Sequence, residues 1–161
     1  MVNGFISTLV AFLIGGATLS FNFSAADSAG NEIYSSDGII VTFGGNYRME
    51  TDDILVVSDG KTKGIYQKHI DEMVLQPVDE SAQTGIMDNP FALLQNPGGA
   101  YTVTPSDADS NGIPRKIALK AKNGEIYTIL VKGYSKTAAP ESSVFTIDPG
   151  QYPSAVVTDL R

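Results

Sequence analysis

The sequence predicts a mostly β chain of the α+β class, built as one large antiparallel sheet or open barrel of about nine to eleven short strands. Three observations lead to this fold class. Short segments in which apolar and polar residues alternate recur along most of the chain, as half-buried strands require. Asp59-Gly60 and Asn123-Gly124 are strong two-residue hairpin signals between such segments. Residues 5–14 and 91–95 favour helix instead, and these two pieces can cover one side of the sheet.

Size and composition limit the classes of protein that this chain can be. A length of 161 residues suits one domain with a sizeable core, which we expect to span residues 1–161. The net charge of -7, from 18 acidic and 11 basic residues, disfavours nucleic acid as a partner. The absence of cysteine excludes disulfides and thiolate chemistry.

Residues 5–14 form a long apolar run, FISTLVAFLI, and their spacing predicts a helix that must be covered. A secretory signal needs basic residues ahead of its apolar segment, but the first basic residue is Arg48. The run is also shorter than the roughly 20 residues that span a bilayer. We therefore expect protein to cover this helix, and any export signal to be absent from this numbering. Gly15-Gly16 ends the helix.

The first half of the chain predicts six strands, each bounded by a turn signal. They cover residues 17–24, 32–43, 47–50, 54–57, 63–67 and 73–78. Gly38 suggests a bulge or bend in the second strand. The continuous apolar run 54–57 indicates a strand covered on both faces. The polar residues 79–88 predict a loop.

The second half predicts a short helix followed by hairpins. Asn89 and Pro90 suit the N-cap and first position of the helix 91–95. The strands that follow cover residues 100–104, 113–122, 125–133 and 144–147, with a final extended segment at 151–160.

One polar loop resembles a metal-binding motif. Residues 107–112, DADSNG, copy the first half of an EF-hand calcium loop. The twelfth position of such a loop should be glutamate, but it is Ala118, and strands rather than helices flank the motif. We favour an acidic hairpin loop, and calcium binding remains the alternative.

The sequence supplies no recognisable active site. His69 is the single histidine, no nucleophile-elbow sequence surrounds any serine, and no His/Cys cluster suggests a metal. We expect His69 to lie on the surface, in a loop that leads into a strand. The acidic pairs Asp52-Asp53, Asp71-Glu72 and Asp79-Glu80 are adjacent residues, so their side chains diverge. We expect a non-enzymatic protein with neither metal nor cofactor.

Large apolar side chains gather on one expected sheet face. They include Leu19, Phe21, Phe23, Ile39, Val41, Phe43, Tyr47, Met49, Met73, Leu75, Ile117 and Leu119. One interpretation is an ordinary core beneath the helices. The other is a hydrophobic cleft in which flexible methionines adapt to an acyl ligand.

A longer stretch resembles the signature region of LolA-like outer-membrane lipoprotein carriers. The stretch is residues 38–66, GIIVTFGGNYRMETDDILVVSDGKTKGIY, with the aromatic-Arg step Tyr47-Arg48 and the segment VSDGK at 57–61. Downstream, NPFALL at 89–94 is similar to the Pro-Phe-x-Leu-Leu helix of the family. FTIDP at 145–149 and VTDLR at 157–161 resemble its closing strand and tail. The order of these motifs covers nearly the whole chain.

The resemblance implies a half-open antiparallel barrel wrapped around the N-terminal helix and the short second helix. It also implies a non-catalytic periplasmic carrier, which takes lipoprotein acyl chains from an inner-membrane releasing complex to an outer-membrane acceptor. We expect a monomer. The alternatives are a related periplasmic lipid-binding protein and a structural or interaction β-domain with a filled core.

The implied acyl-chain cavity draws its lining from both helices and the sheet. The expected residues are Phe5, Leu9, Phe12, Leu13, Leu19, Phe21, Phe23, Ile39, Val41, Phe43, Tyr47, Met49, Met73, Leu75, Phe91 and Leu94. Arg48 corresponds to one arginine of the family and is a candidate for lid gating. Phe43-Gly44 stands where many carriers have an Arg-Pro pair that is tied to lid movement, so that part of the switch is missing.

Overall fold

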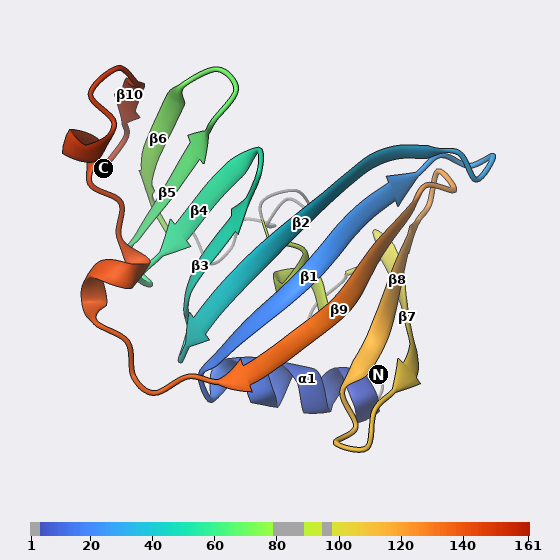
Figure 1. The fold of residues 1–161 in the computed structure, drawn as a ribbon. Helices are drawn as coiled ribbons and strands as arrows, with labels where there is room; N and C mark the ends of the chain where they lie inside the picture. The colour runs from blue at the N-terminus through green and yellow to red at the C-terminus, as the bar shows by residue number, and fades with distance from the viewer. Residues whose placement is uncertain (1–3, 79–88, 95–97) are drawn as a thin grey trace.

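The computed structural model describes residues 4–78, 89–94 and 98–161, and its centre is one large curved sheet (Figure 1). The predicted fold class is confirmed: within these residues, ten strands form an unclosed sheet in the order β10-β6-β5-β4-β3-β2-β1-β9-β8-β7. The strands are β1 (Ala17–Ala26), β2 (Glu32–Phe43), β3 (Asn46–Thr51), β4 (Ile54–Ser58), β5 (Thr62–Gln67), β6 (Glu72–Pro77), β7 (Tyr101–Ala108), β8 (Pro114–Ala121), β9 (Ile126–Lys136) and β10 (Val156–Asp159). The predicted loop 79–88, including Asp79-Glu80, lies outside the described residues.

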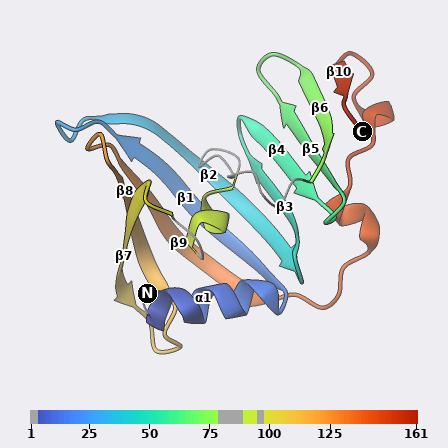
Figure 2. The same ribbon diagram turned by 180° about the vertical axis from the view of Figure 1, so that it is seen from behind.

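Strand pairing follows the chain except at two places. β1 pairs with β2 on one side and with the distant β9 on the other, so it joins the two groups of hairpins. β10 pairs with β6 in parallel, whereas the other described pairs are antiparallel. The sheet curves around the helix α1 (Gly4–Ile14) and the short 3-10 helix η1 (Pro90–Leu94), which lie on its inner side (Figure 2).

Gly16 ends α1, as the sequence predicted, and Gly44 of the β2–β3 hairpin bonds to the end of the helix. Gly16 has a φ of +103°, a left-handed conformation that favours glycine. The last carbonyls of α1 are not left unpaired, because the Leu13 oxygen accepts from the Gly16 N–H and the Ile14 oxygen accepts from the Gly44 N–H at 2.9 Å.

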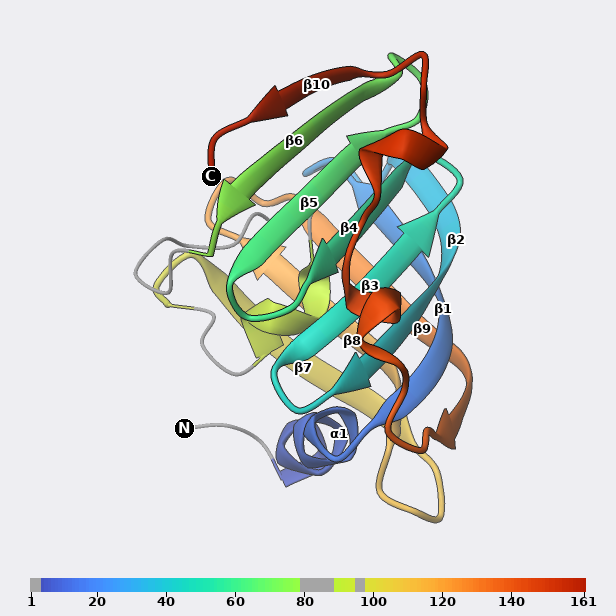
Figure 3. The ribbon, with the colours of Figure 1, turned by 90° about the vertical axis from the view of Figure 1, so that its left-hand side faces the viewer.

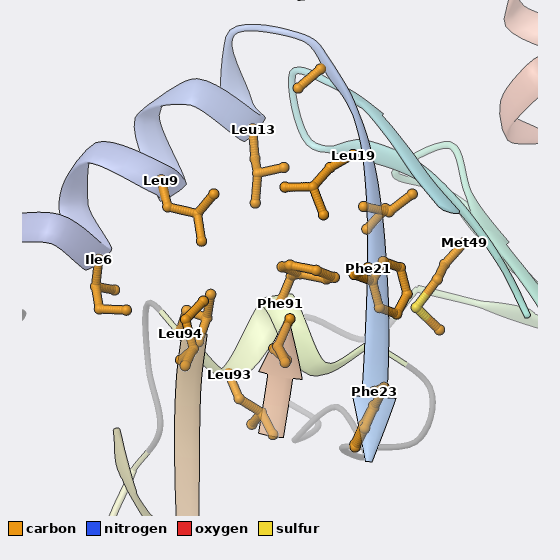
Figure 4. Packing of buried hydrophobic residues seen from close by; sticks show 14 of the residues in the cluster. Ile6, Leu9, Leu13, Leu19, Phe21, Phe23, Met49, Phe91, Leu93 and Leu94 are labelled. Carbon is orange, nitrogen blue, oxygen red and sulfur yellow. The ribbon is translucent and has the colours of Figure 1, made fainter. Parts of the chain in front are cut away.

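The inner face of α1 packs into the main core. Ile6, Leu9 and Leu13 are buried at helical spacing (Figure 4). Phe5, which we expected to face inward, is 46% exposed. The run is apolar on almost every side, so its composition alone does not show which side packs.

A second, smaller hydrophobic cluster lies on the outer face of β4–β6. Its buried members are Leu55, Val57, Met73, Leu75 and Phe145. The C-terminal segment crosses this face (Figure 3). β4 is thus covered on both sides, as its continuous apolar sequence predicted.

The C-terminal segment covers this cluster with a 3-10 helix rather than with the strand predicted at 144–147. This helix, η2 (Ser142–Phe145), is followed by a second short one, η3 (Pro149–Gln151). The Val144 N–H donates to the Glu141 oxygen at 3.0 Å, so the segment bonds to itself instead of to a strand. Its Phe145 side chain, 3% exposed, packs against the sheet.

The Asp71 carboxylate helps to hold the C-terminal segment in place. It accepts hydrogen bonds from the Ser154 hydroxyl at 2.6 Å and the Tyr66 hydroxyl at 2.6 Å. These two bonds lower the pKa of Asp71. Tyr66 also stacks against Tyr152, with ring centroids 4.4 Å apart.

Gly38 serves close packing rather than the predicted bulge. The β1–β2 register is continuous through this position and shifts only between Ala25 and Ala26. A Cβ atom on Gly38 would lie 2.7 Å from Cζ of Phe21, so glycine leaves room for that ring.

Gly64 offers a test of the outer cluster. An added Cβ would lie 2.5 Å from Cγ2 of Ile147 and 3.3 Å from Cγ2 of Val57, so Gly64→Ala should overpack it. We expect a loss of about 1–3 kcal/mol in the free energy of unfolding, measured by urea denaturation. Gly45→Ala is the control, because nothing lies within 4 Å of its added Cβ. Equal stabilities for the two variants would contradict the packing described here.

Leu9 offers a test of the main core. Its side chain is 0% exposed, so Leu9→Ala should reduce the free energy of unfolding by about 2–5 kcal/mol. Phe5→Ala, on the same helix, should cost less than half as much because Phe5 is 46% exposed. A larger loss for Phe5→Ala in the same denaturation experiment would mean that the other face of α1 packs inward.

Candidate functional site

A cavity of about 350 Å³ lies on the inner face of β1–β5. This volume falls within the roughly 300–1,000 Å³ range of small-molecule sites. Its floor and walls are mostly apolar and its rim is polar. The lining residues are Phe21, Phe23, Tyr34, Met49, Thr51, Asp53, Ile54, Gln67, His69 and Ile70.

Strand register explains why apolar side chains converge on this cavity. Phe21 lies opposite Gly38, which in turn lies opposite Thr51, so these residues form one row on the inner face. Alternate residues of a strand share a face, so Phe23 and Met49 belong to the same side. Figure 4 shows the Phe21 ring between Phe91 and Met49.

Aromatic contacts fix the rings of the wall. Phe21 packs edge-to-face against Phe91, with centroids 5.2 Å apart. Phe23 packs in the same way against Tyr34 at 6.3 Å and Tyr127 at 6.0 Å. Such pairs favour one ring orientation, so the wall is preformed rather than assembled around a ligand.

The rim carries a hydrogen-bonded cluster of Tyr34, Asp53 and His69, which we call the rim cluster. The Tyr34 hydroxyl donates to Oδ2 of Asp53 at 2.8 Å, and Nε2 of His69 contacts Oδ1 of the same carboxylate. The Tyr34 bond and then the His69 bond lower the pKa of Asp53. Burial, followed by the bond to Asp53, raises the pKa of Tyr34.

Three segments that are distant in sequence form this rim cluster. Tyr34 lies on β2, Asp53 in the turn before β4, and His69 in the turn before β6. His69 is in a turn with its side chain 73% exposed, as the sequence predicted, but it also faces an acidic partner. Asp52 lies on the outer face, so the predicted divergence of the Asp52-Asp53 pair is confirmed.

Three of the sixteen side chains that we expected in an acyl-chain cavity, Phe21, Phe23 and Met49, line this one. Others fill the main core beside it instead: Leu9, Leu13, Leu19, Phe91 and Leu94. Phe12 and Tyr47 pack against that core, and Tyr47 also borders a hollow of about 190 Å³ near the end of α1. The helix α1 thus packs against one end of the curved sheet and does not line the cavity.

Five expected cavity residues lie on the opposite face, which corrects the prediction. Leu19 and Phe21 pair with Ile40 and Gly38, so the even-numbered residues of β2 face inward. The outward residues are therefore Ile39, Val41 and Phe43, and by the same alternation Met73 and Leu75 in β6. The run Ile39-Ile40-Val41 is apolar in both alternation phases, so the sequence does not reveal which phase faces inward.

Arg48 also lies on the outer face, which removes it from the mouth of the cavity. It borders an outer groove of about 550 Å³ and pairs with Glu50, their charged atoms 3.7 Å apart. Lys68 pairs with the same Glu50 at 2.8 Å, and Lys132 pairs with Asp37 at 2.7 Å. These ion pairs place charged side chains along the outer groove, whereas the inner cavity is more apolar and is therefore the better candidate site for an apolar ligand.

In the loop 107–112, the carboxylate of Asp109 stabilises the turn by accepting hydrogen bonds. Asp109 accepts hydrogen bonds from the backbone N–H groups of Asn111 and Ile113 and from the Tyr134 hydroxyl. Across the part of the chain that the structure describes, no group of three or more His, Cys, Asp or Glu residues could hold a metal ion. The preferred interpretation, an acidic hairpin loop, agrees with these contacts.

Comparison with known proteins reveals similarity at the level of fold. No family model and no curated protein matches the sequence. An uncharacterized conserved protein from Thermus thermophilus has a similar structure, with a TM-score of 0.56, 10% identity, and 96% of each chain covered. A LolA superfamily protein from Nitrosomonas europaea is similar over 88% of this chain and 97% of its own, with a TM-score of 0.54 and 10% identity. The fold is therefore LolA-like.

Within the described residues, no helix combines the length and the apolar character that crossing a bilayer requires.

Tyr34→Phe tests the rim cluster. It removes the bond that most lowers the pKa of Asp53, so this pKa should rise toward its ordinary value of 3.8, as measured by NMR titration of the carboxyl. A lowered pKa contributes stability that is present above the unfolded value and lost as the pH falls through the folded value. The variant should therefore lose less stability than wild type on acidification below about pH 4.

Tyr66→Phe is the matched control, because it removes an equivalent hydroxyl bond from Asp71, which holds the C-terminal segment and lies outside the rim cluster. It should leave the pKa of Asp53 unchanged. If the two variants shift Asp53 equally, the hydrogen bond from Tyr34 does not set its ionisation.

Proposed function

We propose that this protein is a non-catalytic carrier that binds the acyl chains of lipoproteins in the inner cavity. The observation that carries the proposal is an apolar cavity of about 350 Å³ on the concave face of an unclosed LolA-like sheet. The motifs in residues 38–66 and 89–94 point to the same class of protein. By the same resemblance, the carrier works in the periplasm, between an inner-membrane releasing complex and an outer-membrane acceptor. We also propose that it is a monomer.

The chemistry of the walls suits a hydrocarbon chain. Phe21, Phe23 and Met49 are buried and form apolar surface, and Ile54 extends it toward the rim. Transfer of a methylene group from water to such a surface contributes about 0.8 kcal/mol. The Met49 side chain can adapt to chains of different shape because it is unbranched and polarizable.

Release must be possible as well as binding. Ile70 borders the cavity but is 55% exposed, so the apolar surface continues from the interior to the solvent. A bound chain would therefore present part of itself at the mouth, where an acceptor can compete for it. Arg48 takes no part in this exit, because it lies on the outer face.

A second candidate function is an interaction domain with a filled core. The closely packed core among α1, η1 and the sheet favours it, because this core occupies much of the concave face. This candidate predicts no uptake of an acyl probe. The same binding experiment therefore separates the two functions.

Ile70→Asn tests the carrier function. The change removes apolar surface at the mouth, and we expect affinity for a fluorescent fatty-acyl probe to fall about fivefold, equivalent to about 1 kcal/mol. Ile39→Asn is the matched control: Ile39 is 52% exposed but lies on the outer face, so binding should not change. Affinity is measured by fluorescence titration, and thermal unfolding of both variants checks their folding.

Native mass spectrometry of the purified protein provides an independent measurement, since a carrier should retain an acylated species. Absence of probe binding by the wild-type protein would refute the carrier function. Equal effects of the two variants would place the binding site elsewhere.

A further inference from the structure

The rim cluster places charge at the mouth of an apolar cavity. Its members Tyr34, Asp53 and His69 line the same cavity as the buried Phe21 and Met49. A cavity that held only hydrocarbon would not need a carboxylate at this position, and burying part of a charge costs free energy unless it is paired or hydrogen-bonded. The arrangement matches an amphiphile, whose apolar chain ends in a polar head.

The charge of Asp53 is held in position. Its carboxylate is bonded on both oxygens, by the Tyr34 hydroxyl and by His69, and the side chain is 32% exposed. An ionised carboxylate offers about four lone-pair sites, so these two contacts leave room for further donors. Asp53 is ionised in neutral solution, as an ordinary aspartate is, and its hydrogen bonds lower its pKa further.

The neighbouring cations make their hydrogen bonds and ion pairs with groups other than this carboxylate, although the charge of Lys68 contributes to the lowered pKa of Asp53. Of the described residues that line the cavity, none is Lys or Arg. Lys68 precedes His69 but donates to Oε2 of Glu50 at 2.8 Å and to the Thr51 oxygen at 2.7 Å. Arg48 also pairs with Glu50, on the outer face. His69 is thus the basic side chain that shares the mouth with Asp53.

We propose that the rim cluster binds the head group of the amphiphile and selects heads that carry a protonated amine over anionic heads. The inference rests on the proposed function, because the acyl chain must occupy the cavity. An ammonium group would donate to the free lone pairs of Asp53 and to the Tyr34 hydroxyl oxygen. A carboxylate or phosphate head would be repelled by Asp53.

Amphiphiles with the same tail and different heads test this selectivity on the full chain. Dodecylammonium, dodecanoate and the uncharged dodecyl maltoside are each used, below their micelle concentrations, to displace a fluorescent fatty-acyl probe. For the wild-type protein, we expect dodecylammonium to compete about 3- to 10-fold better than dodecanoate, the range of a partly exposed charge interaction.

Asp53→Asn should remove most of this preference and leave competition by dodecyl maltoside unchanged. Asp52→Asn is the matched control for the net charge of -7, because it removes the same charge one residue away on the outer face. It should keep the preference. His69→Lys alters a side chain that is 73% exposed and sets a permanent cation against Asp53, so it should also abolish the preference without affecting folding.

The outcomes separate the two proposals. If the probe does not bind at all, the carrier function itself fails. If the probe binds but the ratio of ammonium to carboxylate affinity is equal in Asp53→Asn and Asp52→Asn, the head-group site is refuted and the carrier function stands. A preference that persists in His69→Lys would likewise refute the site.

Two natural sources could supply the amine, and further competition experiments distinguish them. The first experiment compares phosphatidylethanolamine with phosphatidylglycerol. The second uses a synthetic diacylated lipopeptide and compares the form that has a free α-amino group with the N-acetylated form. Preference for the free lipopeptide identifies an amino terminus, and preference confined to phosphatidylethanolamine identifies a lipid head. Absence of preference in both pairs would overturn the proposal.

Discussion

The packing of the Phe21 ring over Gly38 connects the main core to the cavity. The ring is 1% exposed, contacts Phe91 edge-on, and also forms part of the cavity wall. It occupies this place only because Gly38 has no side chain, since a Cβ there would lie 2.7 Å from the ring. β1, which carries Phe21, also joins the two groups of hairpins. Displacement of this ring would therefore disturb both the main core beneath α1 and the wall of the cavity.

The two faces of the sheet are stabilised differently along its length. Near β1, β8 and β9 the inner face is covered by α1 and η1. At β4–β6 the outer face is covered by the C-terminal segment, which Asp71 holds through Ser154. α1 reaches Ile40 of β2 but not the part of the inner face around Tyr34 and Ile54, and that is where the cavity lies. The cavity thus lies on the part of the inner face that α1 does not cover.

The cavity combines an apolar interior with one fixed negative charge at its rim. The interior alone is compatible with any hydrocarbon, because burial of apolar surface is not directional. Directional contacts come from Tyr34, Asp53 and His69, so these residues are where selectivity among amphiphiles can arise. The similarity to a LolA superfamily protein at 10% identity concerns the fold.

The sequence alone was sufficient for both inner helices, the hairpin turns and the strands β1–β9, because these depend on local periodicity and on local capping. It was not sufficient at 144–147, where the predicted strand is the 3-10 helix η2. Asn89 caps η1 as predicted, its Oδ1 accepting from the Phe91 N–H at 3.1 Å. Tertiary structure decided which face of each strand turns inward. In Ile39-Ile40-Val41 both alternation phases are apolar, and only the pairing of Ile40 with Leu19 of β1 selects one. It also brought together Tyr34, Asp53 and His69, whose convergence depends on strand pairing between distant segments rather than on any local pattern.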